Sequence, residues 1–277
     1  MHGAIKAKTI TLKQVYTFDE LSMTKNLHYQ QQGSGADIIL IHGLFGSLEN
    51  LNMVAKGLKD NYRVTNIDVR NHGLSFHKNS MSYQELAQDV VDLMAMINIE
   101  RAHILGHSMG GKIAMQLALD HSEKVDKLIV ADIAPVAYPP HHNLIIEGLQ
   151  SIKLEDINNR KDADKQLSAF VDDIGVRQFL LRNLVAKDGK FNFKCNLDNI
   201  QQCYRQIMAA NEGKQDFKGE TLFIKGGNSD YITAAHRDII HALYPNSRAK
   251  IIQGTGHWLH AEKTTVFNKI VNDYLSL

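Results

Sequence analysis

The sequence predicts an α/β fold in which helices cover both faces of a mostly parallel central sheet, with a small helical cap as an insert. Three observations predict this arrangement. Short apolar runs alternate with longer amphipathic stretches from about residue 26 onward, which is the pattern of βαβ units. The runs are continuously apolar, as expected of strands that are buried on both faces. Residues 135–218 break the alternation and offer helix-length segments instead.

Length, composition and charge narrow the class of protein. The chain has 277 residues, 44% apolar and 22% charged, which is ordinary for a globular protein with one large domain. A net charge of +1 offers no bulk attraction to nucleic acid or to an anionic membrane. No apolar run approaches the roughly 20 residues of a membrane span, and no signal-peptide pattern begins the chain. We therefore expect a cytoplasmic monomer or homodimer that binds a small molecule.

Six apolar runs are predicted to form the core strands, at residues 37–42, 62–69, 102–105, 127–133, 221–224 and 249–252. Helices are predicted between them at residues 48–58, 82–97, 110–119, 235–243 and 265–275. The clearest helix is 82–97, where apolar residues recur at spacings of three and four and define one face. Ligands of such sheets bind at the carboxyl ends of the strands, so functional residues should directly follow the runs.

Residues 135–218 are predicted to form the cap, so that the core comprises residues 26–134 and 219–277. The cap opens with Pro135, Pro139 and Pro140 and then shows little strand pattern; Val176–Val185 is typical of its helix-length segments. Residues 1–25 form an N-terminal extension. Because residues 1–22 carry no helix or strand pattern, we expect them to be dispensable, with Met23 as an alternative start.

The segment Gly106-His107-Ser108-Met109-Gly110 fits the pattern G-x-S-x-G. The pattern alone recurs by chance in about one protein in ten of this size. Here it follows a predicted strand and precedes a predicted helix, which is the setting of a nucleophile elbow. Glycines let the backbone turn tightly around the serine. The alternative is a glycine-rich turn in which the serine only caps the helix. Ser108 is therefore the predicted nucleophile.

His257 is the candidate base, because a serine hydroxyl does not ionise near pH 7 without one. In proteins with this elbow the histidine comes last in chain order. His257 follows the last predicted strand, within the short glycine-rich loop 254–258. His260 would begin the next helix and is the weaker candidate. Together, Ser108 and His257 predict a serine hydrolase of the α/β-hydrolase fold.

Two backbone N–H groups are expected to bind the oxyanion of the tetrahedral intermediate. One belongs to Met109, the residue after the nucleophile, and the other to a loop after an early strand. His42-Gly43-Leu44-Phe45-Gly46 follows the first run, and we choose Leu44 as its donor. The alternative for His42-Gly43 is an ordinary strand-exit turn.

Two aspartates compete as the acid that orients the histidine. Asp230 follows the run 221–224, the commonest place for the acid in this fold, but it is also a natural turn residue. Asp132 ends the apolar strand predicted over residues 127–131, one strand earlier, where some α/β-hydrolases carry the acid instead. A carboxylate that closes so apolar a run needs a partner, because burying it alone is costly. The residues favour Asp132 and leave Asp230 open.

Apolar residues of the strand-exit loop and the cap are expected to line the acyl pocket, with help from residues beside the base. The candidates are His42, Phe45, Met109, Phe170, Phe179, Leu180 and Trp258. The alternative for the cap residues is plain cap core. Cys195 and Cys203 have no CxxC or Cys/His ligand spacing, so free thiols are expected. No HExxH motif occurs, and we expect no metal and no cofactor.

Five segments resemble the bacterial YbfF-type esterases and, more distantly, the animal α/β-hydrolases close to them. These are HGLFGSLENL (42–51), DVRNHGLS (68–75), GHSMGGKIAM (106–115), LIVADIAPVAY (128–138) and GHWLHAEK (256–263). The resemblance runs from about Ile38 to the end of the chain. Asn71-His72 is its more specific feature, since many α/β-hydrolases have Arg-Gly there.

The resemblance implies hydrolysis of carboxylesters and thioesters with short to medium acyl chains, a small helical cap, and no metal or organic cofactor. It implies a triad of Ser108, Asp132 and His257, which adds weight to Asp132. The rival functions are a C–C bond hydrolase or a lyase on the same triad, and a ligand-binding protein that keeps the triad without catalysis. Dehalogenase and epoxide hydrolase chemistry needs an aspartate nucleophile, so Ser108 argues against both.

Overall fold

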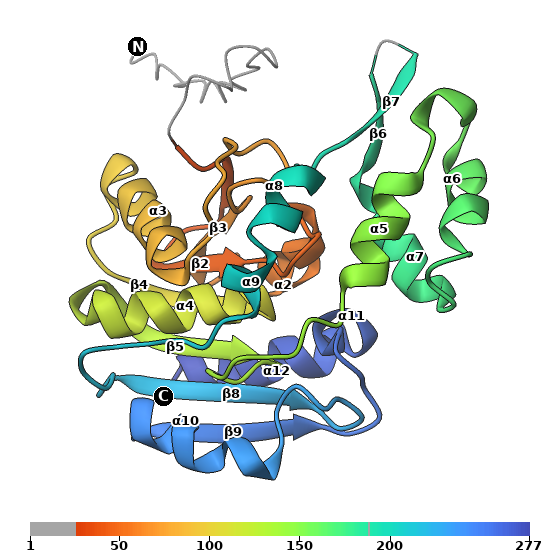
Figure 1. Ribbon diagram of the computed structural model, residues 1–277. Coiled ribbons are helices and arrows are strands. Elements are labelled where there is room, and N and C mark those ends of the chain that lie inside the picture. Colours follow the sequence, from red (N-terminus) through yellow and green to blue (C-terminus); the bar gives the residue numbers. More distant parts are fainter. Residues whose placement is uncertain (1–25, 188) are drawn as a thin grey trace, which may run out of the picture.

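The computed structural model describes residues 26–187 and 189–277, and its centre is a seven-stranded sheet of order β1-β3-β2-β4-β5-β8-β9 (Figure 1). The strands are β1 (Tyr29–Gln32), β2 (Ala36–Ile41), β3 (Tyr62–Ile67), β4 (Ala102–His107), β5 (Val125–Ala131), β8 (Glu220–Gly226) and β9 (Ser247–Ile252). β1 pairs antiparallel with β3, and all other pairs are parallel. The carboxyl ends of six strands therefore meet at one edge.

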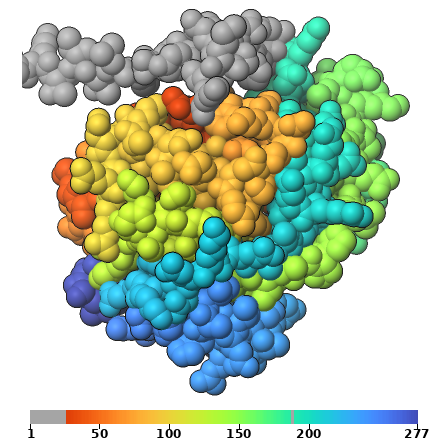
Figure 2. All heavy atoms as spheres, turned by 60° about the vertical axis from the view of Figure 1, so that its left-hand side comes forward, coloured from red at the N-terminus to blue at the C-terminus, as the bar shows by residue number. Residues whose placement is uncertain are grey.

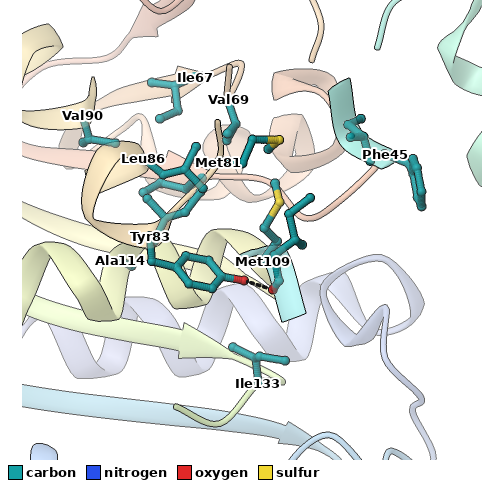
Figure 3. Packing of buried hydrophobic residues seen from close by; sticks show 14 of the residues in the cluster. Phe45, Ile67, Val69, Met81, Tyr83, Leu86, Val90, Met109, Ala114 and Ile133 are labelled. Atoms are coloured by element: carbon teal, nitrogen blue, oxygen red, sulfur yellow. Dashed lines mark hydrogen bonds between the residues drawn. The ribbon is translucent and has the colours of Figure 1, made fainter. Parts of the chain in front are cut away.

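Helices cover both faces of this sheet, and the predicted fold class is confirmed. They are α2 (Asn52–Leu58), α3 (Tyr83–Met96), α4 (Met109–Asp120), α10 (Arg237–Leu243), α11 (Leu259–Glu262) and α12 (Thr264–Leu275). Alternate residues of β2 belong to two different cores: Ile38 packs in a cluster with α2 and α12, whereas Ile39 packs in a cluster with α3 and α4. Figure 3 shows part of the second cluster, where Leu86 and Val90 of α3 lie close to Ile67.

Residues 135–218, the cap segment, connect β5 to β8. The helices are α5 (Asn143–Ser151), α6 (Arg160–Leu167), α7 (Ile174–Leu180), α8 (Leu197–Gln202) and α9 (Tyr204–Met208). Of these, α5, α6 and α7 lie beyond the carboxyl ends of the strands, and the last part of the segment runs back past α4 to the start of β8 (Figure 1). In the space-filling view the teal part of this segment lies directly against the orange part of the core (Figure 2). One such contact is the Asn196 N–H, which donates to Asn71 O at 2.8 Å.

The cap segment also contains a hairpin that the sequence pattern did not predict. The helix expected over residues 176–185 ends at Leu180, and a 3-10 turn, Leu181–Asn183, leads into β6 (Leu184–Lys187) and its partner β7 (Lys190–Phe193). In β7, Phe191 and Phe193 are half-buried while Lys190 and Asn192 are exposed. That period of two is the signature of a strand with one covered face. Pairing with β7 therefore makes residues 184–187 a strand, although their spacing relative to residues 176–180 is helical.

Residues 1–25, the edge strand β1 and the two cysteines complete the comparison with the sequence prediction. The N-terminal extension, residues 1–25, and the prediction that residues 1–22 are dispensable lie outside the described residues. β1 (YQQQ) was missed because it is a polar edge strand with no apolar run. Cys195 and Cys203 are free, buried thiols. Within the described parts of the chain, no helix has the length and apolar character to cross a membrane.

A buried amine joins the two ends of the cap segment to the helix that follows Ser108. Lys112 of α4 is 1% exposed, and its Nζ donates to Val136 O at 2.6 Å and to Ala209 O. Nζ also lies 5.1 Å from the ring centroid of Tyr83 and 5.3 Å from that of Tyr138. Burial lowers the pKa of Lys112 to about 7, because removal from water disfavours the ammonium form.

This buried amine should make the protein more stable as the pH rises. The pKa of Lys112 is about 7 in the folded chain against an ordinary 10.5, so the unfolded chain binds more protons between these values. Above the unfolded pKa the amine is neutral in both states, and its burial costs no protonation free energy. As the pH falls toward the folded pKa, the unfolded chain gains a proton that the folded chain does not bind, and the folded state loses stability relative to it. The free energy of unfolding should therefore rise by up to about 1.4 kcal/mol per unit between pH 7 and pH 9.

Lys112→Met should flatten this dependence, since the variant has no amine to titrate. Urea unfolding followed by the fluorescence of Trp258 at several pH values measures the slope in both proteins. An unchanged slope in the variant would show that Lys112 is not its source.

Candidate active site

Ser108 forms a strained turn between β4 and α4. Its backbone has φ 55° and ψ −122°, a conformation that non-glycine residues rarely adopt. The flanking glycines explain how the turn fits. A Cβ on Gly106 would lie 2.0 Å from Gly110 O, and a Cβ on Gly110 would lie 2.2 Å from Ile41 O. The spacing of the motif thus reflects two backbone contacts that no larger residue permits.

Ser108, His257 and Asp132 come together at the carboxyl edge of the sheet. The Oγ of Ser108 is 2.9 Å from His257 Nε2, and His257 Nδ1 is 2.8 Å from Asp132 Oδ2. Asp132 accepts only, so Nδ1 carries the ring proton and Nε2 of the neutral ring faces the serine hydroxyl. The serine follows β4, the aspartate follows β5 and the histidine follows β9. This line of contacts can transfer the serine proton to the imidazole.

The Asp132 carboxylate is fully buried and is held by three donors. His257 Nδ1 and the Ser229 hydroxyl donate to Oδ2, and the Gly226 N–H donates to Oδ1 at 2.9 Å. Several donors offset the cost of burying a carboxylate. Asp230 is exposed, and no hydrogen bond within residues 26–187 and 189–277 joins it to His257. The loop after β8 contributes Ser229 to this cluster rather than an acid.

The strand-exit loop 42–46 lies against Ser108, since a Cβ on Gly43 would be 3.2 Å from Ser108 Cβ. His42 Nδ1 donates to Gly43 O at 2.8 Å, while His42 Nε2 accepts the Val69 N–H at 3.0 Å. Gly43 O belongs to the same peptide as the Leu44 N–H, so His42 fixes the orientation of that donor. Neither the Leu44 N–H nor the Met109 N–H is paired with an acceptor from the described part of the chain.

His42 keeps the tautomer that this arrangement needs. Burial lowers the pKa of His42 from its ordinary value of 6.5, because the interior disfavours the charged ring. A neutral ring has one donor and one acceptor nitrogen, and both are occupied by backbone groups. His42 was predicted to bind substrate. It does line the cavity, but both of its ring nitrogens are hydrogen-bonded to backbone groups of Gly43 and Val69.

A cavity of about 220 Å³ opens at Ser108. Its walls come from the strand-exit loop, the cap segment and the loop of His257. Of the predicted pocket residues, those in the lining are His42, Phe45, Phe179, Leu180 and Trp258. Phe170 does not join them: it packs against Gly148 of α5, where an added Cβ would lie 2.8 Å from Phe170 Cβ. The side chain of Met109 is buried in the core, and Met109 is not part of the cavity lining.

Tyr231 and His107 both pack against the imidazole of His257. The Tyr231 ring stacks on it with centroids 4.0 Å apart and planes at 23°. The His107 ring lies 4.8 Å away, and its Nε2 donates to His257 O at 2.8 Å. Burial lowers the pKa of His107 well below its ordinary value. His260, the weaker candidate base, is buried behind His107, and burial lowers its pKa to about 4.

A second, more open hollow of about 560 Å³ adjoins the first. The two share His141, Tyr231 and His257 in their linings. The wider hollow also includes Asp230, Asn228 and Thr233, and it is therefore the more polar of the two. His141 Nε2 and Tyr231 OH lie 2.7 Å apart and bridge the cap segment to the core between the hollows.

Several residues of this site were not singled out from the sequence. Ser229 could have been found from the sequence. The acid of this fold is usually the third residue after a glycine such as Gly226, and Ser229 occupies that position. His107 lies inside the G-x-S-x-G motif, but only the fold shows which loop its ring contacts. His141 and Tyr231 had no signal, since they meet only when the cap segment lies over the loop after β8. No cluster of three or more His, Cys, Asp or Glu side chains in the described ranges has an arrangement suited to a metal ion.

Comparisons with known proteins agree with this picture. A family model described as the alpha/beta hydrolase fold matches residues 38–166. Esterase YbfF of Escherichia coli is 38% identical over 248 residues, which cover 89% of this chain and 96% of the relative. The sn-1-specific diacylglycerol lipase ABHD11 of Mus musculus is 38% identical over 247 residues, covering 86% of this chain and 80% of the relative.

A solved structure, described as a marine microorganism esterase, is also similar to this chain. It superposes with a TM-score of 0.87 at 39% identity, covering 90% of this chain and 99% of that structure. The resemblance inferred from the five sequence segments is confirmed. This chain belongs to the YbfF-type esterases of the α/β-hydrolase superfamily.

Proposed function

We propose that this protein hydrolyses carboxylesters with short to medium acyl chains through an acyl-enzyme formed on Ser108. The observation that carries the proposal is the continuous line of contacts Ser108 Oγ–His257 Nε2 (2.9 Å) and His257 Nδ1–Asp132 Oδ2 (2.8 Å). Both distances lie within the range of a hydrogen bond. Such a line is what nucleophilic acyl transfer by a serine requires.

The reaction has two half-reactions. In the first, His257 Nε2 takes the Ser108 proton while Oγ attacks the acyl carbonyl, and the tetrahedral oxyanion accepts the Leu44 and Met109 N–H groups. His257 then protonates the leaving oxygen, and the alcohol departs. In the second, His257 takes a proton from water, the hydroxide attacks the acyl carbon, and Ser108 recovers its proton as the acid leaves. Asp132 stabilises the charged imidazole in both.

The two hollows suit the two halves of an ester. We assign the acyl chain to the less open cavity at Ser108, whose cap wall includes Phe179 and Leu180. We assign the leaving group to the open, polar hollow beside His257, because His257 must protonate the leaving oxygen. A thioester would fit the same scheme with sulfur as the leaving atom.

The role of Ser108 is tested by Ser108→Ala. The variant should fold normally and lose ester hydrolysis by a factor on the order of 10⁶, because no other hydroxyl in residues 26–187 and 189–277 is hydrogen-bonded to His257 Nε2. The measurement is hydrolysis of p-nitrophenyl butyrate, together with mapping of the residue labelled by a fluorophosphonate probe. Labelling of a different residue, or tight binding of esters without turnover in the native protein, would contradict the proposal. The second outcome would favour a ligand-binding role.

The acyl assignment is tested by a chain-length series. The value of kcat/KM for p-nitrophenyl esters should peak at short or medium chains and fall sharply at palmitoyl, since the cavity is about 220 Å³. Phe179→Ala should shift the peak to longer chains because it removes part of the wall. Phe170→Ala, a cap phenylalanine outside the cavity lining, is the matched control. Equal shifts in both variants would show that Phe179 does not limit the acyl chain length in the way proposed.

The acid is tested by a pair of isosteric substitutions. Asp132→Asn should leave the fold intact and lower kcat by up to about 10⁴, because an amide cannot stabilise the charged imidazole and favours the wrong tautomer. Asp230→Asn, in the neighbouring exposed position, should change kcat less than about twofold. Steady-state kinetics on one ester measure both. A large loss in Asp230→Asn with a small one in Asp132→Asn would reverse the assignment.

A further inference from the structure

Phe45 holds a backbone conformation that its own chemistry does not favour. Its φ is 57°, in the left-handed region that costs a non-glycine residue about 1–2 kcal/mol. Phe45 directly follows Leu44, the proposed oxyanion donor. Any relaxation of Phe45 would therefore rotate the peptides on which the oxyanion hole depends, and other groups must hold it in place.

Two buried side chains hold the two polar groups of Phe45. The Phe45 N–H donates to His72 Nε2 at 3.2 Å, and His72 Nδ1 donates to Arg70 O at 2.9 Å. Because burial lowers the pKa of His72 to about 3, the ring stays neutral and Nε2 stays an acceptor. On the other side, Asn183 Nδ2 donates to Phe45 O and also to Leu180 O at 3.2 Å.

These two side chains come from different parts of the chain. His72 belongs to the loop after β3, in the core. Asn183 is 3% exposed and lies in the 3-10 turn directly after α7. The residues of α7 that line the acyl cavity are Val176, Phe179 and Leu180. One amide thus connects the acyl wall of the cap segment with the loop that carries Leu44.

We propose that Asn183 is a positioning residue that makes the cap segment part of the oxyanion hole. The inference rests on the proposed function. Asn183 fixes the Phe45–Gly46 peptide, His72 fixes the Leu44–Phe45 peptide, and His42 fixes the Gly43–Leu44 peptide. Three consecutive peptides are therefore held by three side chains, and only Asn183 comes from the cap segment. Without Asn183 the ester can still bind, but the Leu44 N–H is no longer oriented to donate to the developing oxyanion.

The test is Asn183→Asp, which keeps the shape and replaces the donor with an acceptor. We expect kcat to fall at least tenfold while KM for p-nitrophenyl butyrate changes less than twofold, because the interaction matters only in the transition state. A second readout compares two inhibitors of equal chain length. A trifluoromethyl ketone, which forms an oxyanion on Ser108, should bind at least tenfold more weakly, and the methyl ketone should bind unchanged.

Asn196→Asp is the matched control. It places the same new charge in the cap segment, and an aspartate caps the start of α8 as well as the asparagine does. Kinetics and both inhibitors should be unchanged in this variant. If Asn183→Asp fails to fold by circular dichroism, Asn183→Ala, which removes the donor without adding charge, takes its place with the same expected losses.

Each outcome decides the matter. Unchanged kcat and inhibitor selectivity in the folded Asn183 variant would overturn the inference while leaving the proposed function intact. Equal losses in the Asn183 and Asn196 variants would overturn it as well, because the effect would then belong to the cap in general. A native protein that neither hydrolyses the ester nor binds the trifluoromethyl ketone would overturn the proposed function and the inference together.

Discussion

Left-handed backbone gathers at the carboxyl edge of the sheet, and the rest of the site depends on how it is held there. Phe45, Asn71, Ser108 and Asp132 all have positive φ between 54° and 63°. Each such residue costs free energy that surrounding contacts must offset. Close glycine packing holds Ser108, three hydrogen bonds hold the carboxylate of Asp132, and side chains from the core and the cap segment hold Phe45. The Asn71 amide donates to Lys78 O and accepts from the Lys78 N–H, which closes its own turn.

Neutral histidines make this network possible. His42, His72 and His107 each direct one ring nitrogen at a backbone carbonyl, and burial lowers the pKa of all three. A buried neutral imidazole can therefore link two backbone groups, because one ring nitrogen donates and the other accepts. His42 and His72 both do so. A cation in place of His107, whose ring lies 4.8 Å from that of His257, would raise the cost of forming the imidazolium during the reaction.

The sequence was sufficient for the core and for the residues that directly follow its strands. Buried parallel strands are continuous apolar runs, so their ends were predicted within about three residues, and Ser108, Asp132 and His257 were candidates because each lies just past such an end. β1 was missed because it is short and polar, and the hairpin was missed because Leu184 and Val185 continue the helical spacing of the residues before them. Ser229, Tyr231 and Asn183 depend on which distant loops meet, and local patterns do not carry that information.

The ring of His257 packs against Tyr231 and His107, and its Nδ1 is hydrogen-bonded to the buried Asp132 carboxylate. A flip of this ring would break the Nδ1 hydrogen bond to Asp132, so in the proposed mechanism the same nitrogen faces Ser108 in both half-reactions. Nε2 must therefore deliver the proton to the departing alcohol and then receive the next one from water at the same point in space. The alcohol has to vacate that point before water can enter. The covalent bond to Ser108 fixes the order of the cycle, alcohol out first and acid out last, and the held imidazole serves both steps from one position.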